Sequence, residues 1–159
     1  MPELPDVEIF KRFCQDNILE KKIDTINVSD SRVIKSADGT FRRHLKNNKY
    51  RAAKRHGKHI FLKVSDGSVL AMHFGMTGKV DYFKGKKPKH AYLTVVFSNG
   101  YKWAYICPRQ FGEIQIAKSI EEYVNDKDLG PDALRISKSV FKKALQGRGR
   151  IKSKLMNQK

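Results

Sequence analysis

The strongest constraint on the fold is a series of short apolar segments that fills residues 50–116. Each segment has the length of a β-strand, and most of them are rich in β-branched or aromatic side chains. Two of the links between segments are Asp66-Gly67 and Asn99-Gly100, which favour the tight turn of a β-hairpin. Strands joined in this way pair antiparallel and predict a β-sandwich or flattened barrel. The predicted strands are residues 50–55, 59–64, 68–73, 79–83, 92–97, 102–107 and 113–116.

Before these strands, the sequence predicts a long helix, a strand and a short helix. Residues 6–19 follow Pro5, which suits a helix start, and they carry apolar side chains at helical spacing. Alternation of apolar and polar side chains predicts a strand at residues 23–28. Residues 38–45 are predicted as a short helix that Asp38 caps. We expect the long helix to pack on the sandwich.

A change of composition predicts a domain boundary near residue 129. Ser119, followed three residues later by Glu122, has the pattern of a capping box and predicts a helix start. From residue 137 onward no acidic residue occurs, and two short basic helical patterns are separated by glycines. The expected fold is therefore α+β, with an N-terminal helix packed on an antiparallel β-sandwich, followed by short C-terminal helices. Residues 1–128 form the sandwich domain, and residues 129–159 begin a second module.

The balance of charge predicts a polyanionic partner. The chain has 33 Lys and Arg against 16 Asp and Glu, which gives a formal net charge of +17. This excess is far beyond what solubility requires, and nucleic acid is the polyanion that it fits best. A basic surface for lipid would accompany a transmembrane span or a basic amphipathic helix. No apolar run is long enough to span a bilayer, so we expect no membrane partner.

The N-terminal sequence and the cysteines indicate a compartment. No secretory signal is visible, because the first residues are acidic rather than basic. Cys14 and Cys107 are too few for a four-cysteine zinc site, and no disulfide between them is indicated. We therefore expect a reduced protein that is not secreted. It would be either cytoplasmic and associated with the nucleoid, or nuclear.

The first residues have two interpretations. If Met1 is removed, Pro2 presents a secondary amine that can attack an electrophilic carbon and form an iminium. A free α-amino group titrates near ~8, so a modest depression of its pKa makes the neutral amine available. Glu3 adds a carboxyl group that can carry protons to and from the reacting group. The alternative is structural, since proline and acidic residues are ordinary at a helix start, and the two interpretations are compatible.

Five short segments carry a more specific pattern. They are MPELPDVE at 1–8, HGK at 56–58, HFGMTG at 73–78, PRQFG at 108–112 and LGPD at 129–132. In the same order and at similar spacing, they resemble the formamidopyrimidine-DNA glycosylase/endonuclease VIII family. The resemblance covers essentially the whole chain. It implies a monomeric enzyme that excises an oxidised base from double-stranded DNA and then cleaves the strand at the abasic site.

The resemblance also implies roles for single residues. Pro2 would attack C1′ of the damaged nucleotide while Glu3 assists by proton transfer, and the Schiff base would permit β- and δ-elimination of the flanking phosphates. Lys58, on a turn between two predicted strands, would contact a DNA phosphate near the lesion; otherwise it is a solvated turn lysine. His90, beside Lys89, matches a phosphate-contacting segment, although a lone histidine near a strand is usually structural.

Met76, Arg109 and Phe111 match the family's void-filling residues. An enzyme that flips a nucleotide leaves a hole in the base stack, which a thioether, a guanidinium and an aromatic ring can occupy. The competing interpretation places Met76 and Phe111 in the core, where such side chains are usually found. Arg109 fits a core poorly without a partner, so it is the most telling of the three.

Several departures from the family pattern stand out. Asp6 replaces a usual glutamate, Gln110 replaces a common second arginine, and Cys107 replaces an aspartate that could orient Arg109. The resemblance further implies that residues 129–159 begin a helix-two-turn-helix module without completing it. The family's zinc finger would lie beyond residue 159, so no cofactor is expected in this chain. The alternative function is that of a non-catalytic damaged-DNA-binding relative or fragment, which retention of Met1 would favour.

Overall fold

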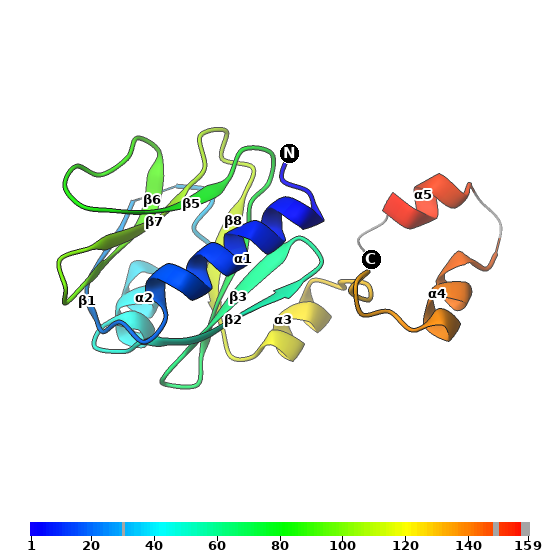
Figure 1. Cartoon of the computed structure of the whole chain (residues 1–159), viewed down its shortest axis with the longest axis horizontal. Helices are drawn as coiled ribbons and strands as arrows, with labels where there is room; N and C mark the ends of the chain where they lie inside the picture. Colours follow the sequence, from blue (N-terminus) through cyan, green and yellow to red (C-terminus); the bar gives the residue numbers. More distant parts are fainter. Residues whose placement is uncertain (30, 148–149, 157–159) are drawn as a thin grey trace.

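The computed structural model describes residues 1–29, 31–147 and 150–156 (Figure 1). In chain order its elements are α1 (Leu4–Ile18), β1 (Ile23–Val28), α2 (Asp38–Leu45), β2 (Tyr50–His56), β3 (His59–Val64), β4 (Val69–His73), β5 (Lys79–Phe83), β6 (Ala91–Phe97), β7 (Lys102–Ile106), β8 (Glu113–Ala117), α3 (Ile120–Asp126), α4 (Lys138–Leu145) and α5 (Ile151–Met156). The strands form two four-stranded sheets, with the orders β1-β6-β7-β5 and β2-β3-β4-β8. Every strand pairs antiparallel with its neighbours. The predicted α+β sandwich with short C-terminal helices is confirmed.

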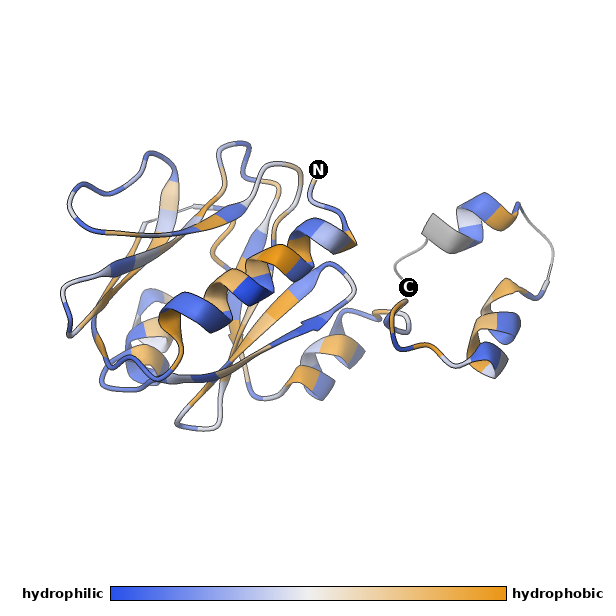
Figure 2. Ribbon diagram, viewed as in Figure 1, coloured by the Kyte–Doolittle hydropathy of each residue, from blue (hydrophilic) through white to orange (hydrophobic). Residues whose placement is uncertain are grey.

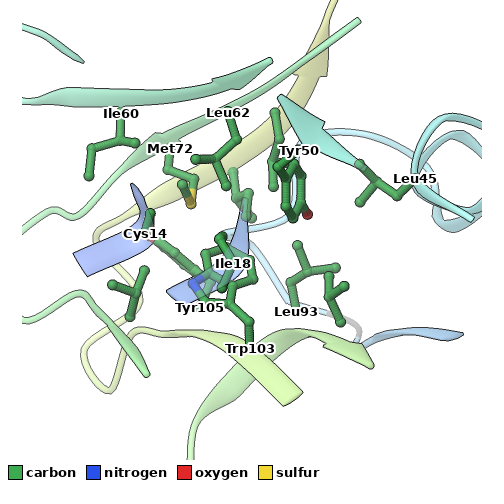
Figure 3. Close-up of a cluster of buried hydrophobic side chains, with 14 of the residues drawn as sticks. Cys14, Ile18, Leu45, Tyr50, Ile60, Leu62, Met72, Leu93, Trp103 and Tyr105 are labelled. Carbon is green, nitrogen blue, oxygen red and sulfur yellow. The ribbon is translucent and has the colours of Figure 1, made fainter. Parts of the chain in front are cut away.

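The core fills the space between the two sheets, and α1 contributes to it (Figure 3). Cys14 and Ile18 are fully buried between side chains of the two sheets. Apolar and polar stretches alternate along α1 (Figure 2), as expected for a helix with one face in a core. The facing side chains are Ile60, Leu62 and Met72 from β3 and β4, and Leu93, Trp103 and Tyr105 from β6 and β7.

Most predicted elements are confirmed to within one or two residues, and the differences have local causes. α1 begins at Leu4 rather than at residue 6, because the Glu3 N–H donates to Asp6 Oδ2 at 2.8 Å and closes the first turn. The prediction that Asp38 caps α2 is wrong: Ala37 occupies the cap position, and Asp38 pairs with Arg42 at 2.8 Å. The predicted start of α3 is confirmed, since the Ser119 hydroxyl accepts the Glu122 N–H at 3.0 Å.

The two short basic helices predicted near the C-terminus are α4 and α5, and they extend beyond the sandwich (Figure 1). Gly147 lies between them with a φ of 92°. Gly149, the second predicted break, lies outside the described residues. Within residues 1–29, 31–147 and 150–156, no helix combines the length and the apolar character needed to cross a bilayer.

Antiparallel pairing gathers distant segments at one end of the sandwich. His73, the last residue of β4, pairs with His59 at the start of β3 and with Glu113 at the start of β8. In the other sheet, Ile106 at the end of β7 pairs with Lys79 at the start of β5. Connections that leave or enter the strands at these residues therefore lie together. We call this the motif end; it carries residues 56–59, 73–79 and 106–113.

Candidate functional site

The start of α1 and the β2–β3 turn meet at the motif end. Lys58 Nζ lies 2.7 Å from Glu3 Oε2, so two side chains that the sequence places 55 positions apart form an ion pair. The Glu3 side chain is 52% exposed and that of Lys58 is 21% exposed, which leaves the carboxylate open to a ligand. Pro2 is half-buried and immediately precedes the pair. The predicted catalytic residues are thus close together.

A pocket of about 540 Å³ opens beside this pair. One wall comes from the N-terminus and the β2–β3 turn, and the other comes from the segment after residue 128. The volume lies in the range of pockets that hold small molecules, and an extruded nucleotide is of that size. The residues that line the first wall include Met1, Glu3, Leu4 and Lys58, and those that line the second include Leu129, Pro131, Ile136, Phe141 and Leu145.

A buried ion pair fixes the β2–β3 turn. Arg55 Nη1 and Nη2 donate to the two carboxylate oxygens of Asp132, at 2.5 and 3.0 Å, and both side chains are nearly inaccessible. Arg55 also donates to Glu8 on α1 at 3.2 Å. The same Asp132 carboxylate accepts the Gly57 N–H at 2.7 Å. Because Gly57 precedes Lys58, this network ties the position of Lys58 to α1 and to the segment after residue 128.

The sequence does not single out Arg55, although Glu8 and Asp132 belong to two of the quoted segments. One available signal was an arginine at the end of a predicted strand, two residues before the Gly57-Lys58 turn. Its bidentate geometry depends on Asp132, 77 positions away, and this pairing follows only from the tertiary structure.

The division into residues 1–128 and 129–159 stays a prediction.

The environment of Asp132 keeps it charged. Burial alone would raise the pKa of Asp132, but hydrogen bonds from Arg55 and from the Gly57 N–H outweigh burial and hold this pKa below its ordinary value. A carboxyl group whose pKa falls on folding stabilises the protein above its unfolded pKa, near ~3.9. That contribution is lost as the pH falls through the lowered value.

The three predicted void-filling residues stand on two adjoining loops at the motif end. Met76 and Phe111 are 40% and 53% exposed, so they face solvent and the competing interpretation, which places them in the core, is wrong. The Arg109 guanidinium lies 5.6 Å from the centre of the Phe111 ring, and the backbone N–H of Arg109 donates to Thr77 Oγ1 at 3.2 Å. A Cβ on Gly75 would lie 2.3 Å from the Phe111 backbone, so only glycine allows the loops to approach this closely.

A second guanidinium, which the sequence does not single out, joins this group. Arg32 lies 5.4 Å from the centre of the Phe111 ring and donates to the backbone oxygens of Arg109 and Gln110, at 3.2 Å each. Phe111 is therefore flanked by two cationic groups. Cys107, which replaces a possible anionic partner of Arg109, is fully buried. Arg32 supplies a positive charge in a region where Gln110 replaces a common arginine.

His90 also reaches the motif end. Its backbone oxygen accepts the Cys107 N–H at 3.1 Å, and its side chain is exposed. The backbone of His90 has a φ of 61°, which is uncommon for a residue other than glycine.

Among the described residues, no group of His, Cys, Asp and Glu side chains is arranged to hold a metal ion.

His59 and His73 form an aromatic pair behind the Lys58 turn, with ring centres 4.7 Å apart. Burial, together with the nearby His73, His56 and Lys127, lowers the pKa of His59 to about 3. Burial also lowers the pKa of His73, against the opposing effect of Glu113. His59 is thus neutral in the folded protein throughout the pH range in which an exposed histidine becomes charged.

We expect the folded state to lose stability as the pH falls below about 6.5, where His59 is protonated only in the unfolded chain. With a folded pKa of about 3, the loss from His59 alone between pH 8 and pH 5 is about 2 kcal/mol. Urea unfolding of the wild type and of His59→Gln at both pH values measures how much His59 contributes to the loss of unfolding free energy. An equal fall in stability in both proteins would show that His59 is not its source.

A family model for the formamidopyrimidine-DNA glycosylase N-terminal domain matches residues 1–114. Over 99% of its length the chain is 32% identical to the formamidopyrimidine-DNA glycosylase of Pelotomaculum thermopropionicum. Over its whole length it is also 32% identical to that of a Wolbachia species from Brugia malayi. The chain spans 60% of the length of each relative.

The fold agrees with solved structures of the same kind. A complex of Lactococcus lactis Fpg with DNA that contains N7-benzyl-Fapy-dG matches 99% of the chain with a TM-score of 0.87 and 25% identity. A complex of the LlFpg protein with a THF-DNA and an inhibitor matches with a TM-score of 0.88, also at 25% identity. The chain covers 61% of each of these structures.

Proposed function

The chain belongs to the formamidopyrimidine-DNA glycosylase family, and from this membership we propose that it carries the catalytic centre of a DNA glycosylase and abasic-site lyase. The observation that supports this most directly is the Glu3–Lys58 ion pair beside Pro2, at the mouth of a pocket large enough for a nucleotide. The proposed substrate is double-stranded DNA with an oxidised base or an abasic site.

The proposed chemistry starts once Met1 has been removed and the Pro2 amine is neutral. The Pro2 nitrogen gives its lone pair to C1′ of the damaged nucleotide, and the bond between C1′ and the base breaks. The base departs with the bonding electron pair and takes up the proton that the Pro2 nitrogen loses. Glu3 then protonates O4′, the bond between C1′ and O4′ breaks, and the nitrogen lone pair forms the iminium. Removal of a C2′ proton then expels the 3′ phosphate by β-elimination. No cofactor takes part in these steps.

Other residues at the motif end hold the substrate in this proposal. Lys58 is 2.7 Å from Glu3 and remains partly exposed, so it can orient the carboxylate and contact a phosphate near the lesion. Met76, Arg109 and Phe111 occupy the space that the extruded nucleotide leaves, and Arg32 adds a cation beside them. His90 contacts a backbone phosphate. The protein acts on DNA as a monomer, either in a cytoplasm that contains the nucleoid or in a nucleus.

Borohydride trapping on an abasic-site duplex tests this function. Borohydride reduces an iminium to a stable amine, so Met1-free protein is expected to become covalently joined to the DNA through Pro2. Intact-mass analysis of the same sample reports whether Met1 is present, and peptide mapping locates the adduct. The matched control is protein that retains Met1, in which the Pro2 nitrogen is part of a peptide bond and cannot react.

Specific binding of the duplex by Met1-free protein without any adduct would contradict the proposed chemistry. That result would support the alternative of a non-catalytic damaged-DNA-binding protein. An adduct mapped to a lysine instead of Pro2 would retain the lyase activity but reject Pro2 as the nucleophile.

A further inference from the structure

A second cationic surface lies away from the pocket, on the loop between β5 and β6. We call residues 84–90 the lysine loop, because four of these seven residues are lysine and none is acidic. The four lysines are exposed. Among the ion pairs of the described residues, none involves a lysine of this loop. The loop is a hydrophilic projection at the side of the sandwich (Figure 2). The positive charge on this surface is therefore available to an anion.

The course of the lysine loop follows from the sheet topology. β5 and β6 both pair antiparallel with β7, which lies between them, so they run in the same direction and the loop must cross β7. The loop leaves at Phe83, opposite Lys102, and enters β6 at Ala91, opposite Ile106. These positions are the two ends of β7. At about 3.3 Å per residue, the loop spans roughly 13–17 Å of the outer sheet surface.

Contacts along its length hold the lysine loop in place. Lys102 Nζ donates to the Gly85 oxygen at 2.7 Å, and Lys87 Nζ donates to Ser29 Oγ at 3.0 Å. Ala91, Ala104 and Ile106 form a small buried cluster on this sheet, with Phe83 packed against it. The loop is thus anchored at its start and middle rather than free in solution.

Aromatic rings contact the lysine loop at Lys84, the end that lies away from the motif end. Lys84 Nζ lies 4.5 Å from the centre of the Tyr101 ring, and this ring stacks on Tyr82 with the ring centres 4.9 Å apart. The other end of the loop, at His90, reaches the motif end, where the His90 oxygen accepts the Cys107 N–H. Cys107 is two positions before Arg109. One end of the lysine loop is therefore joined to the segment that carries Arg109, and its lysines lie between that segment and Tyr101.

We propose that Lys84, Lys86 and Lys87 bind the phosphates of the duplex DNA that flanks the lesion on the Arg109 side. This inference rests on the proposed function, and it extends the DNA contact beyond the pocket. Consecutive phosphates of one strand are about 3.4 Å apart along the helix axis, so roughly 13–17 Å corresponds to four or five nucleotides. Exposed lysines without base contacts suit this role, because phosphate contacts fix position without reading sequence.

The test compares the variant Lys84→Ala/Lys86→Ala/Lys87→Ala with a control that removes the same charge elsewhere. The control is Lys46→Ala/Lys49→Ala/Lys63→Ala, at the opposite end of β3 from Lys58, near the Asp66-Gly67 turn. Kd is measured as a function of salt for abasic-analogue duplexes with short or extended flanks. If each lysine neutralises one phosphate, the log–log salt slope of the loop variant on the long duplex falls by about 3.

We expect the wild type and the control to bind the long duplex more tightly than the short one, and the loop variant to lose most of this gain. Equal changes of slope in the two triple variants would overturn the proposal, since general charge would then explain the effect. Unchanged affinity of the loop variant for duplex DNA, with loss of binding to anionic lipid vesicles, would overturn it in favour of a membrane surface.

Borohydride trapping at saturating DNA separates this inference from the proposed function. The loop variant is expected to form the Pro2 adduct as completely as the wild type, because its substitutions lie outside the pocket. If no protein forms the adduct but the effect of flank length persists in the wild type and control alone, the flanking site stands and the proposed chemistry fails. If the adduct forms but flank length has no effect on Kd, the lysine-loop proposal fails by itself.

Discussion

Glu3→Gln is expected to slow excision of an oxidised base by about 10²–10⁴-fold, the usual contribution of a positioned acid–base group. The substitution keeps the size of the side chain and its ability to accept a hydrogen bond from Lys58, which lies 2.7 Å away. It removes the negative charge of the carboxylate and the capacity to carry a proton. Single-turnover excision is measured on the oxidised-base duplex that the Met1-free wild type cleaves fastest.

The same variant is expected to retain much of its lyase activity on a preformed abasic site. No base has to leave there, the sugar already equilibrates with its open aldehyde without protonation of O4′ by Glu3, and the Pro2 amine is unchanged. Glu20→Gln is the matched control, since it removes a carboxylate beyond the opposite end of α1, where Glu20 pairs with the exposed Arg51. Equal loss of both steps in Glu3→Gln would contradict separate roles for Pro2 and Glu3.

Arg55→Met is expected to destabilise the protein by about 3–5 kcal/mol, because it leaves the Asp132 charge buried without its partner. Arg55 and Asp132 are 5% and 6% exposed, so solvent cannot replace the lost contacts. For a chain of this size, the expected fall in Tm is on the order of 10 °C. Thermal and urea unfolding at pH 7 measure the loss.

A matched control lies on the same strand. Arg51→Met breaks the pair with Glu20, in which both side chains are 55% exposed, and is expected to cost at most about 1 kcal/mol. Adding Asp132→Leu to Arg55→Met removes the unpaired charge and is expected to restore part of the stability. A small loss in Arg55→Met, similar to that of Arg51→Met, would show that the buried pair does not hold the β2–β3 turn.

Local sequence patterns predict the elements of this fold well. The Asp66-Gly67 and Asn99-Gly100 turns lie between paired strands, as predicted, because the conformation of a tight turn depends on a few adjacent residues. Asp38 shows the limit of such reasoning. It has the residue type of a helix cap, but its side chain pairs with Arg42 and the helix starts one residue earlier than a cap at Asp38 requires.

By itself, the sequence determined the antiparallel strands, the long first helix and the excess of positive charge, because each depends on neighbouring residues or on composition. The resemblance in five segments also predicted the residues around Pro2. Only the tertiary structure decided which distant groups meet: Arg55 with Asp132, Arg32 with Phe111, and the lysine loop with the strand that leads to Arg109. The physical reason is that burial and charge pairing act between side chains that are close in space, and the register of the sheets sets those distances.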